Sequence, residues 1–183
     1  MHKIEVNMKE VFLSFAKANE DSNKAILAIL NKMSNEDREK NRKSYYGSLS
    51  NLARHVLGGT FYFLSMFTEV AAKNPAALKA LGPLAKIALI NGKKITEDEW
   101  KKSTGFFKTV DKAFVDFIAA LDEKEFSAPV KLDWYKGKPA TVPLYFILQQ
   151  LIAHGTHHRG QISQILDSLK IDNDYSGINV KFL

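Results

Sequence analysis

Three of the chain's five histidines lie in the stretch HGTHHRGQISQIL, at His154, His157 and His158. Imidazole is a common ligand of divalent transition metals, so this grouping raises the question of a metal site. Helical residues turn by about 100° each, and residues four apart therefore lie about 40° from each other on one face. His154 and His158 have this spacing and could bind one ion from a single helix. His157 lies nearer the edge of that face.

The stripe that contains His154 and His158 is otherwise apolar. It continues through Ile147, Leu151, Ile162, Ile165 and Leu169. Buried polar groups need partners, and a metal ion would supply one to both imidazoles. Protein zinc sites use three or four ligands, so the pair needs at least one more. The HEXXH motif of metalloproteases is excluded, because Gly155 and Thr156 stand where its glutamate is required.

His55 is the candidate for the third ligand. It lies in the middle of a predicted helix and is followed by Gly58 and Gly59. Each glycine inside a helix costs about 1 kcal/mol relative to alanine, so the pair indicates that a helix or a ligand approaches closely there. Taken alone, a histidine at this position is more often a core or boundary residue, and an HxxxH pair predicts a metal only weakly. The remaining histidine, His2, lies near the first residue.

Four stretches with helical periodicity would position these histidines. They cover about residues 8–33, 44–73 (or 48–73), 96–121 and 142–169. Long amphipathic helices without a convincing sheet predict an all-α fold, a four-helix bundle formed by a single domain over residues 1–183. The connection over residues 74–95 is long enough to return along the bundle. The second and third helices are therefore expected to run in the same direction, and not in a simple up-down-up-down arrangement.

Local signals predict where two of these helices begin. Thr96 and Glu99 have the spacing of a capping box. Thr141 is predicted to be the N-cap of the last helix, with Pro143 in the first turn, where its missing N–H costs nothing. Residues 127–143 are expected to form a loop or a short hairpin up to that point. The residues after the last helix are expected to be an ordered extension.

Composition excludes several kinds of site and partner. The chain has no cysteine, so disulfides, thiolate zinc sites, iron–sulfur clusters and cysteine nucleophiles are excluded. The net charge of +6 comes from dispersed lysines, and no nucleic-acid partner is expected. Neither a signal peptide nor an apolar run of about 18 residues is found, which predicts a cytoplasmic protein with no membrane partner.

The motif HGTHHRGQISQIL resembles the C-terminal signature of the DinB-like (damage-inducible) family of metal-dependent four-helix-bundle proteins. SYYGSLSNLARHVLGGTFYFLSMF, DSNKAILAILNKMSNED and the closing DNDY are similar to other parts of the family pattern, so the resemblance covers nearly the whole chain. It implies that His55, His154 and His158 bind a divalent transition metal, nickel or zinc, with a coordination position left open. His157 takes the family's non-ligating position. The glycine pair after His55 and the connection over 74–95 depart from the family pattern.

Such a site could serve three alternative functions, of which the resemblance implies the first. Some relatives are thiol-dependent S-transferases that use bacillithiol or mycothiol, and a low-molecular-weight thiol as cofactor would suit a chain without cysteine. The substrate would then be a small electrophile, attacked by the thiolate. A metal-dependent hydrolase is an alternative, although no general acid or base can be assigned from the sequence. The other alternative is a non-catalytic, stress-associated metal-binding protein. Dimers are common in the family, so a homodimer is also implied.

Other residues around the motif receive predicted roles. Gln161 is predicted to hold an imidazole N–H and so fix a ligand tautomer. Arg159 points away from the histidine face and is expected to make a structural ion pair rather than to bind substrate. Gly160 is expected at a close contact between helices. Tyr62 and Trp134 are candidates for the pocket mouth, but packing is the favoured interpretation for both.

Overall fold

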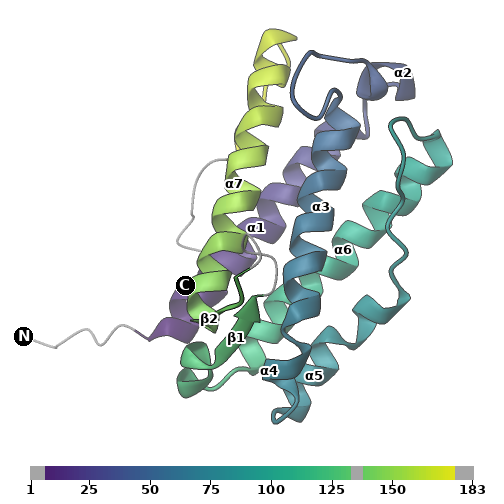
Figure 1. Ribbon diagram of the computed structural model, residues 1–183. Coiled ribbons are helices and arrows are strands. Elements are labelled where there is room, and N and C mark those ends of the chain that lie inside the picture. The colour runs from purple at the N-terminus through teal and green to yellow at the C-terminus, as the bar shows by residue number, and fades with distance from the viewer. Residues whose placement is uncertain (1–6, 133–137, 176–183) are drawn as a thin grey trace, which may run out of the picture.

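The computed structural model describes residues 7–132 and 138–175, and this part of the chain is mainly helical. Its four long helices are α1 (Met8–Leu30), α3 (Leu49–Met66), α6 (Glu97–Ala120) and α7 (Leu144–Ser168). They lie side by side, and α1 and α3 each pack against both α6 and α7 (Figure 1). The predicted all-α fold is confirmed. None of the described helices is both long and apolar enough to cross a membrane.

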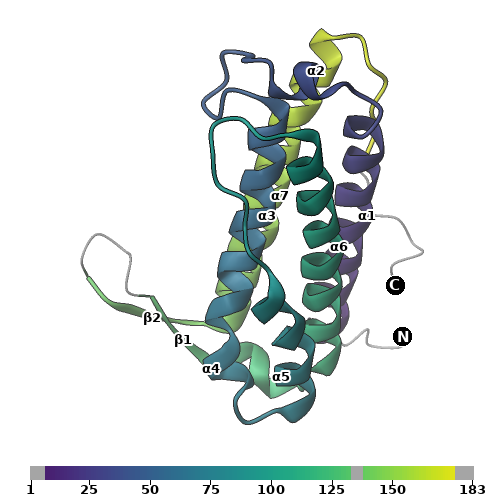
Figure 2. The ribbon, with the colours of Figure 1, turned by 90° about the vertical axis from the view of Figure 1, so that its right-hand side faces the viewer.

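Shorter elements connect the long helices. They are the α-helices α2 (Asn35–Glu39), α4 (Thr68–Ala71) and α5 (Pro75–Leu81), and two 3₁₀ helices at Gly82–Lys86 and Glu123–Ser127. After α5 the chain returns along the bundle to the end where α3 began, and α6 starts there (Figure 2). Consequently α3 and α6 run in the same direction, as the long connection predicted, while α1 and α7 run in the opposite one.

The starts of α3 and α6 are set by side-chain caps. Ser48 is the N-cap of α3, and its hydroxyl accepts a hydrogen bond from the backbone N–H of Asn51. The predicted capping box of α6 is present: the N–H of Thr96 donates to Glu99 Oε2 at 2.8 Å, and Thr96 Oγ1 accepts from the N–H of Glu99 at 3.3 Å. Such caps satisfy N–H groups that have no partner inside the helix.

The start of α7 differs from the prediction. Residues Pro129–Leu132 (β1) and Ala140–Pro143 (β2) form a two-stranded antiparallel sheet, which agrees with the expected short hairpin. Thr141 lies inside β2 and is therefore not the N-cap. Its backbone takes part in strand pairing, so α7 begins only at Leu144, after Pro143, which makes no side-chain cap hydrogen bond. The predicted N-cap at Thr141 is therefore wrong, because this residue pairs with β1.

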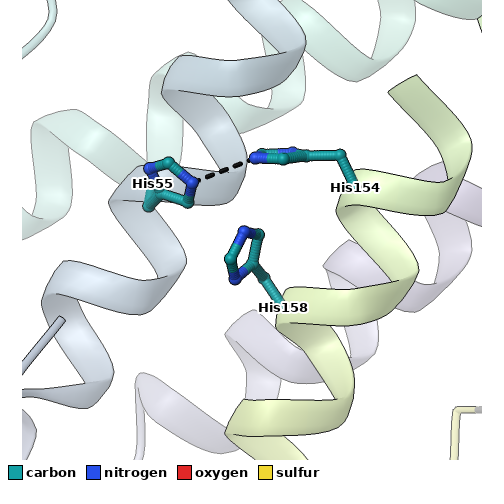
Figure 3. A group of neighbouring side chains, drawn as sticks. All are labelled: His55, His154 and His158. Carbon is teal, nitrogen blue, oxygen red and sulfur yellow. Dashed lines mark hydrogen bonds between the residues drawn. The ribbon is translucent and has the colours of Figure 1, made fainter. Parts of the chain in front are cut away.

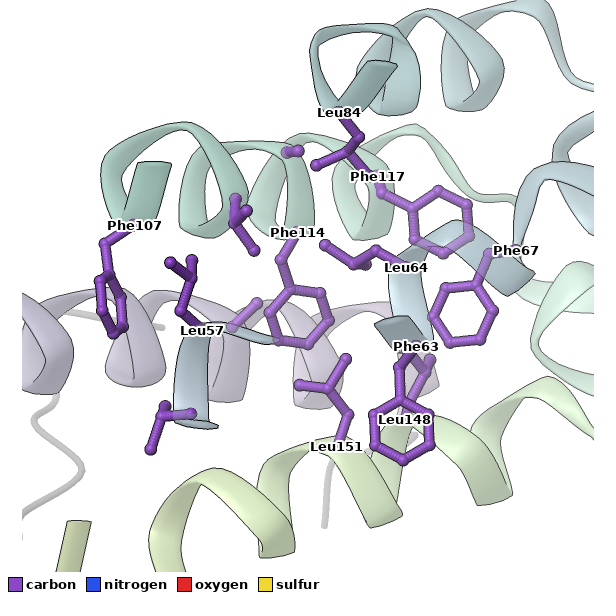
Figure 4. Packing of buried hydrophobic residues seen from close by; sticks show 14 of the residues in the cluster. Leu57, Phe63, Leu64, Phe67, Leu84, Phe107, Phe114, Phe117, Leu148 and Leu151 are labelled. Atoms are coloured by element: carbon purple, nitrogen blue, oxygen red, sulfur yellow. The ribbon is translucent and has the colours of Figure 1, made fainter. Parts of the chain in front are cut away.

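The core lies between the four long helices and is rich in phenylalanine. The rings of Phe67 and Phe117 stack with centroids 5.3 Å apart, which links the end of α3 to α6. Figure 4 shows residues of three helices that meet around Phe114, namely Leu57, Leu64, Phe107, Leu148 and Leu151. Burial of each large apolar side chain stabilises the fold by about 1.5–3 kcal/mol. This packing provides a rigid frame for the facing surfaces of α3 and α7.

Candidate metal site

Helices α3 and α7 bring His55, His154 and His158 together (Figure 3). One potential ligand atom from each residue lies within 4.8 Å of the other two. The Nε2 atoms of His55 and His154 are 3.0 Å apart, and the ring centroid of His158 is 4.5 Å from the centroid of each of the other two rings. The three residues predicted as ligands from the sequence are therefore neighbours in space. Their role as ligands remains a prediction.

The α7 histidines interrupt a buried stripe, as the helical spacing predicted. Leu151 and Ile162 are each 1% exposed, and His158 between them is 7% exposed. His154 is half-buried beside α3. Because both imidazoles lie on the face that packs against α3, they point toward His55 rather than into solvent.

Gly59 provides the space that the His154 ring occupies. A Cβ atom at position 59 would lie 2.3 Å from Cε1 and 2.8 Å from Nδ1 of His154. The close approach predicted from the glycine pair is therefore confirmed at Gly59. At Gly58 a Cβ would lie 3.8 Å from Leu89, which is an ordinary contact. Only the second glycine of the pair is required by the site.

Gln161 contacts two histidines of the motif. Its Oε1 lies 2.8 Å from Nδ1 of His158. When Nδ1 donates this hydrogen bond, Nε2 of His158 keeps its lone pair for a metal, which is the predicted orienting role. The Nε2 atom of Gln161 lies 3.3 Å from Nε2 of His157, which is exposed. His157 is not one of the three histidines whose ligand atoms converge, in agreement with the prediction.

Tyr46 is part of the site and was not predicted from the sequence. Its hydroxyl oxygen lies 2.8 Å from Nε2 of His55, and its ring stacks on that imidazole with centroids 4.1 Å apart. The centroid of the His158 ring is 5.3 Å from that of Tyr46, in an edge-on arrangement. Tyr46 belongs to the loop before α3, where helical spacing gives no information. The only signal was the aromatic pair Tyr45–Tyr46 shortly before the helix.

Burial favours the neutral form of two of the three imidazoles. It lowers the pKa of His154 to about 4, and the charges that His158, His55 and His157 would carry act in the same direction. Burial also lowers the pKa of His55, assisted by His158. Metals bind the neutral imidazole, so these surroundings favour the ligating form near neutral pH.

The distance between the Nε2 atoms of His55 and His154 is one that two nitrogens bound to one divalent transition metal could have. Zinc–nitrogen bonds are about 2.0–2.1 Å long, so two nitrogens bound to one ion in tetrahedral or octahedral geometry lie about 2.9–3.4 Å apart. The observed 3.0 Å between Nε2 of His55 and Nε2 of His154 is within this range. Neutral nitrogen ligands suit zinc and nickel equally, so the ligand set does not distinguish the two metals.

Arg159 is buried on the opposite side of α7 and has a structural role, as expected. Its Nη1 donates to Oδ1 of Asn19 at 2.6 Å and to Oδ1 of Asn23 at 3.2 Å, both on α1. Asn19 and Asn23 in turn donate to the carboxylate of Asp111 on α6. The expected ion pair is thus replaced by a buried network in which two asparagine side chains lie between the guanidinium and the carboxylate.

The prediction for Gly160 is wrong. Among the described residues, nothing lies within 4 Å of a Cβ built at this position, and the residue is exposed. The close contact is at Gly155, where a Cβ would lie 2.9 Å from Nη1 of Arg159 and 3.1 Å from Oδ1 of Asn19. Gly155 is four residues before Arg159 and shares its face toward α1, whereas Gly160 is turned about 100° further toward solvent.

A pocket of about 860 Å³ adjoins His55, which lines it together with Tyr46. Tyr62 is not among its lining residues: its side chain is 48% exposed and packs edge-on against Phe63. Tyr62 therefore does not line this pocket, and its exposure does not support the packing interpretation either. Trp134, the other aromatic candidate, lies outside the described residues.

Comparison with known protein families gives a match. The model of the family described as "DinB family" matches residues 7–169, which include all three converging histidines. The match covers most of the chain and confirms the resemblance seen in its motifs. A comparison with curated proteins gave no match.

Proposed function

The chain belongs to the DinB family, and from this premise we propose that His55, His154 and His158 bind one divalent transition metal, nickel or zinc. The observation that carries the proposal is the convergence of the three imidazoles, two of them with Nε2 atoms 3.0 Å apart. When bound, such a metal supplies Lewis acidity and lowers the pKa of a coordinated thiol or water.

The activity that we propose is transfer of a low-molecular-weight thiol, of the bacillithiol type, to a small electrophile. The chain has no cysteine, so the nucleophilic sulfur has to come from a cofactor. The pocket beside His55, at about 860 Å³, lies within the range of about 300–1,000 Å³ typical of small-molecule sites. It offers room for a thiol and its electrophile next to His55.

Residues around the triad would prepare it for this reaction. Gln161 orients His158 through Nδ1, and Gly59 admits the ring of His154. Burial raises the pKa of Tyr46, so its hydroxyl stays protonated and can donate a hydrogen bond to a group that enters beside His55. We therefore assign to Tyr46 the role of orienting the ligand that enters beside His55.

A panel of thiols and electrophiles tests the proposed reaction. Metal-loaded and metal-stripped protein would be incubated with bacillithiol, coenzyme A or glutathione and small electrophiles, with thioether formation followed by mass spectrometry. We expect product only with the loaded protein. Absence of metal-dependent turnover over the whole panel, for a protein that does bind metal, would favour the non-catalytic metal-binding function.

A homodimer and a cytoplasmic location belong to the same proposal and are supported by the family resemblance and the composition. Light scattering coupled to size-exclusion chromatography tests the dimer. A mass equal to one chain of 20.6 kDa at working concentration would contradict it.

A further inference from the structure

Tyr46 contacts the nitrogen through which His55 would join the metal site. Its hydroxyl oxygen lies 2.8 Å from Nε2 of His55, and its ring stacks on the imidazole with centroids 4.1 Å apart. On the side of α7, Nε2 of His154 lies 3.0 Å from the same nitrogen (Figure 3). One atom of His55 therefore has the triad as one neighbour and a phenol hydroxyl as another.

A hydrogen bond between Tyr46 and Nε2 of His55 excludes a metal from that nitrogen. A neutral ring nitrogen carries either one proton or one lone pair. If the hydroxyl donates, it uses the lone pair that a metal requires. If the hydroxyl accepts, Nε2 carries the proton and has no lone pair to give. The consequence is the same in both directions, whichever tautomer His55 adopts.

The backbone of Tyr46 is held in place from α3. Nδ2 of Asn51 donates to the carbonyl oxygen of Tyr46 at 3.0 Å and to that of Lys93 at 3.1 Å. Oδ1 of Asn51 accepts from Nη2 of Arg54, whose Nη1 donates to the carbonyl oxygen of Ile90 at 2.8 Å. One amide thus ties the loop before α3 to the segment before α6, and it fixes the residue whose side chain contacts His55.

We propose that the hydroxyl of Tyr46 competes with the metal for Nε2 of His55 and is released when the metal binds. The inference rests on the proposed function, because it needs a metal at the triad, and it deepens that function by naming how the site is regulated. Once released, the hydroxyl can donate to the group that enters beside His55. Tyr46 therefore makes ligand orientation depend on metal loading, and Asn51, which acts through Tyr46, is a positioning residue.

Zinc affinity tests the competition without any activity measurement. Competition with a chromophoric chelator near neutral pH would compare the wild type with Tyr46→Phe, which keeps the ring and loses the hydroxyl. We expect Tyr46→Phe to bind zinc about two- to tenfold more tightly, the equivalent of one hydrogen bond that no longer has to be broken. Tyr62→Phe, a change in an exposed ring of α3, should match the wild type. Equal or weaker zinc binding by Tyr46→Phe would overturn the inference.

A double-mutant cycle tests the part assigned to Asn51. Asn51→Ala frees the backbone of Tyr46 and should raise zinc affinity in the wild-type background. In the Tyr46→Phe background it should change nothing, because no hydroxyl remains to be released. Asn91→Ala, a change at an exposed asparagine before α6, serves as the control in both backgrounds. An effect of Asn51→Ala that is equally large with and without the hydroxyl would contradict its role through Tyr46.

Nitrogen NMR of metal-stripped protein separates failure of this inference from failure of the proposed function. The chemical shift of Nε2 in His55 reports its hydrogen bond, so it should change in Tyr46→Phe and stay constant in Tyr62→Phe. An unchanged shift in Tyr46→Phe would refute the competition, whatever the zinc affinity of the wild type. A wild type that shows the expected shift difference and yet binds no zinc would refute the proposed function, and the competition with it.

Discussion

The imidazole of His154 lies against the backbone of Gly59, where a Cβ atom would come within 2.3 Å of the ring carbon Cε1. One glycine of α3 therefore sets the position of one histidine of α7. Ring atoms of a half-buried histidine cannot move aside as the end of a flexible chain can. The geometry of the histidine triad thus depends on a residue that is not itself a ligand.

Replacing Gly59 by alanine should weaken metal binding without unfolding the protein. The new methyl group displaces the His154 ring, and we expect a loss of about tenfold or more in metal affinity, comparable to other changes that misorient a ligand. Gly58→Ala is the matched control, because its Cβ meets only an ordinary contact with Leu89 and gains the same helix propensity. Competition titrations with a chromophoric chelator measure the metal affinity of both variants. Equal affinities for the two variants would contradict the role of Gly59.

Gln161→Ala should also lower metal affinity, since it removes the hydrogen bond to Nδ1 of His158. Loss of such an orienting partner typically costs about 10- to 100-fold. Gln164→Ala, which changes an exposed glutamine on the same helix, should have no effect. The same chelator competition reports the result, and an unchanged affinity in Gln161→Ala would show that His158 is oriented by other contacts.

Tyr46→Phe keeps the ring that stacks on His55 and removes the hydroxyl. We expect full metal content and a fall of about tenfold or more in the rate of thiol transfer, the effect of one lost hydrogen bond to a charged group. Tyr62→Phe serves as the control, because Tyr62 is 48% exposed and does not line the pocket. Turnover by Tyr46→Phe at the wild-type rate would show that the Tyr46 hydroxyl has no role in the reaction.

The buried network around Asp111 should make stability depend on pH. Burial raises the pKa of Asp111 from 3.8 to about 8, although the hydrogen bond from Asn23 and the charge of Arg159 act against this rise. The folded state then holds the proton more tightly than the unfolded chain. The resulting stabilisation is complete below about pH 4 and is lost as the pH rises toward 8.

Urea unfolding of the metal-free wild type and of Asp111→Asn between pH 4 and pH 8 measures this effect. The asparagine has no proton to lose, so the wild type should lose stability relative to the variant as the pH rises. Contributions from the histidines are common to both proteins and cancel in the difference. Parallel stability curves would show that Asp111 keeps the same charge in the folded and unfolded states.

Two glycines of α7 should respond oppositely to alanine. Gly155→Ala places a methyl group 2.9 Å from Nη1 of Arg159 and should destabilise the fold by about 1–3 kcal/mol through overpacking. Gly160→Ala enters open space and should stabilise the helix by up to about 1 kcal/mol. Chemical unfolding measures the free energy of unfolding of both variants. Equal stability of Gly155→Ala and Gly160→Ala would refute the close contact at Gly155.

Periodicity predicted the elements that carry the site, because the apolar faces of long helices are visible in the order of residues. Helix geometry alone predicts that His154 and His158 share one face, because they are four residues apart. The glycine pair that follows His55 in the same helix likewise predicted a close approach, which the structure shows at Gly59. Contacts made by loops were not predictable in this way. Tyr46 reaches His55 from a segment without periodicity, and Asn19, Asn23 and Asp111 look like ordinary polar positions until α1, α6 and α7 are packed together.

The start of α7 shows a second limit. The residues before Leu144 carry a local capping signal at Thr141, yet they pair with β1. A short hairpin was one of the two expectations for residues 127–143, but the local sequence did not predict that its second strand would include Thr141. Likewise, Gly155 and Gly160 lie five residues apart in α7. Only the position of α1 determines which of the two glycines makes the close contact. Local patterns predict the type of element, and packing between elements determines its ends and contacts.

The metal content of the untagged protein tests the central proposal most directly. After supplementation with nickel or zinc and removal of free metal, elemental analysis should find about one equivalent per chain in the wild type and in His157→Ala. His55→Ala, His154→Ala and His158→Ala should each lose it. A wild type that stays free of metal, or triad variants that bind as much metal as His157→Ala, would contradict a metal site formed by His55, His154 and His158.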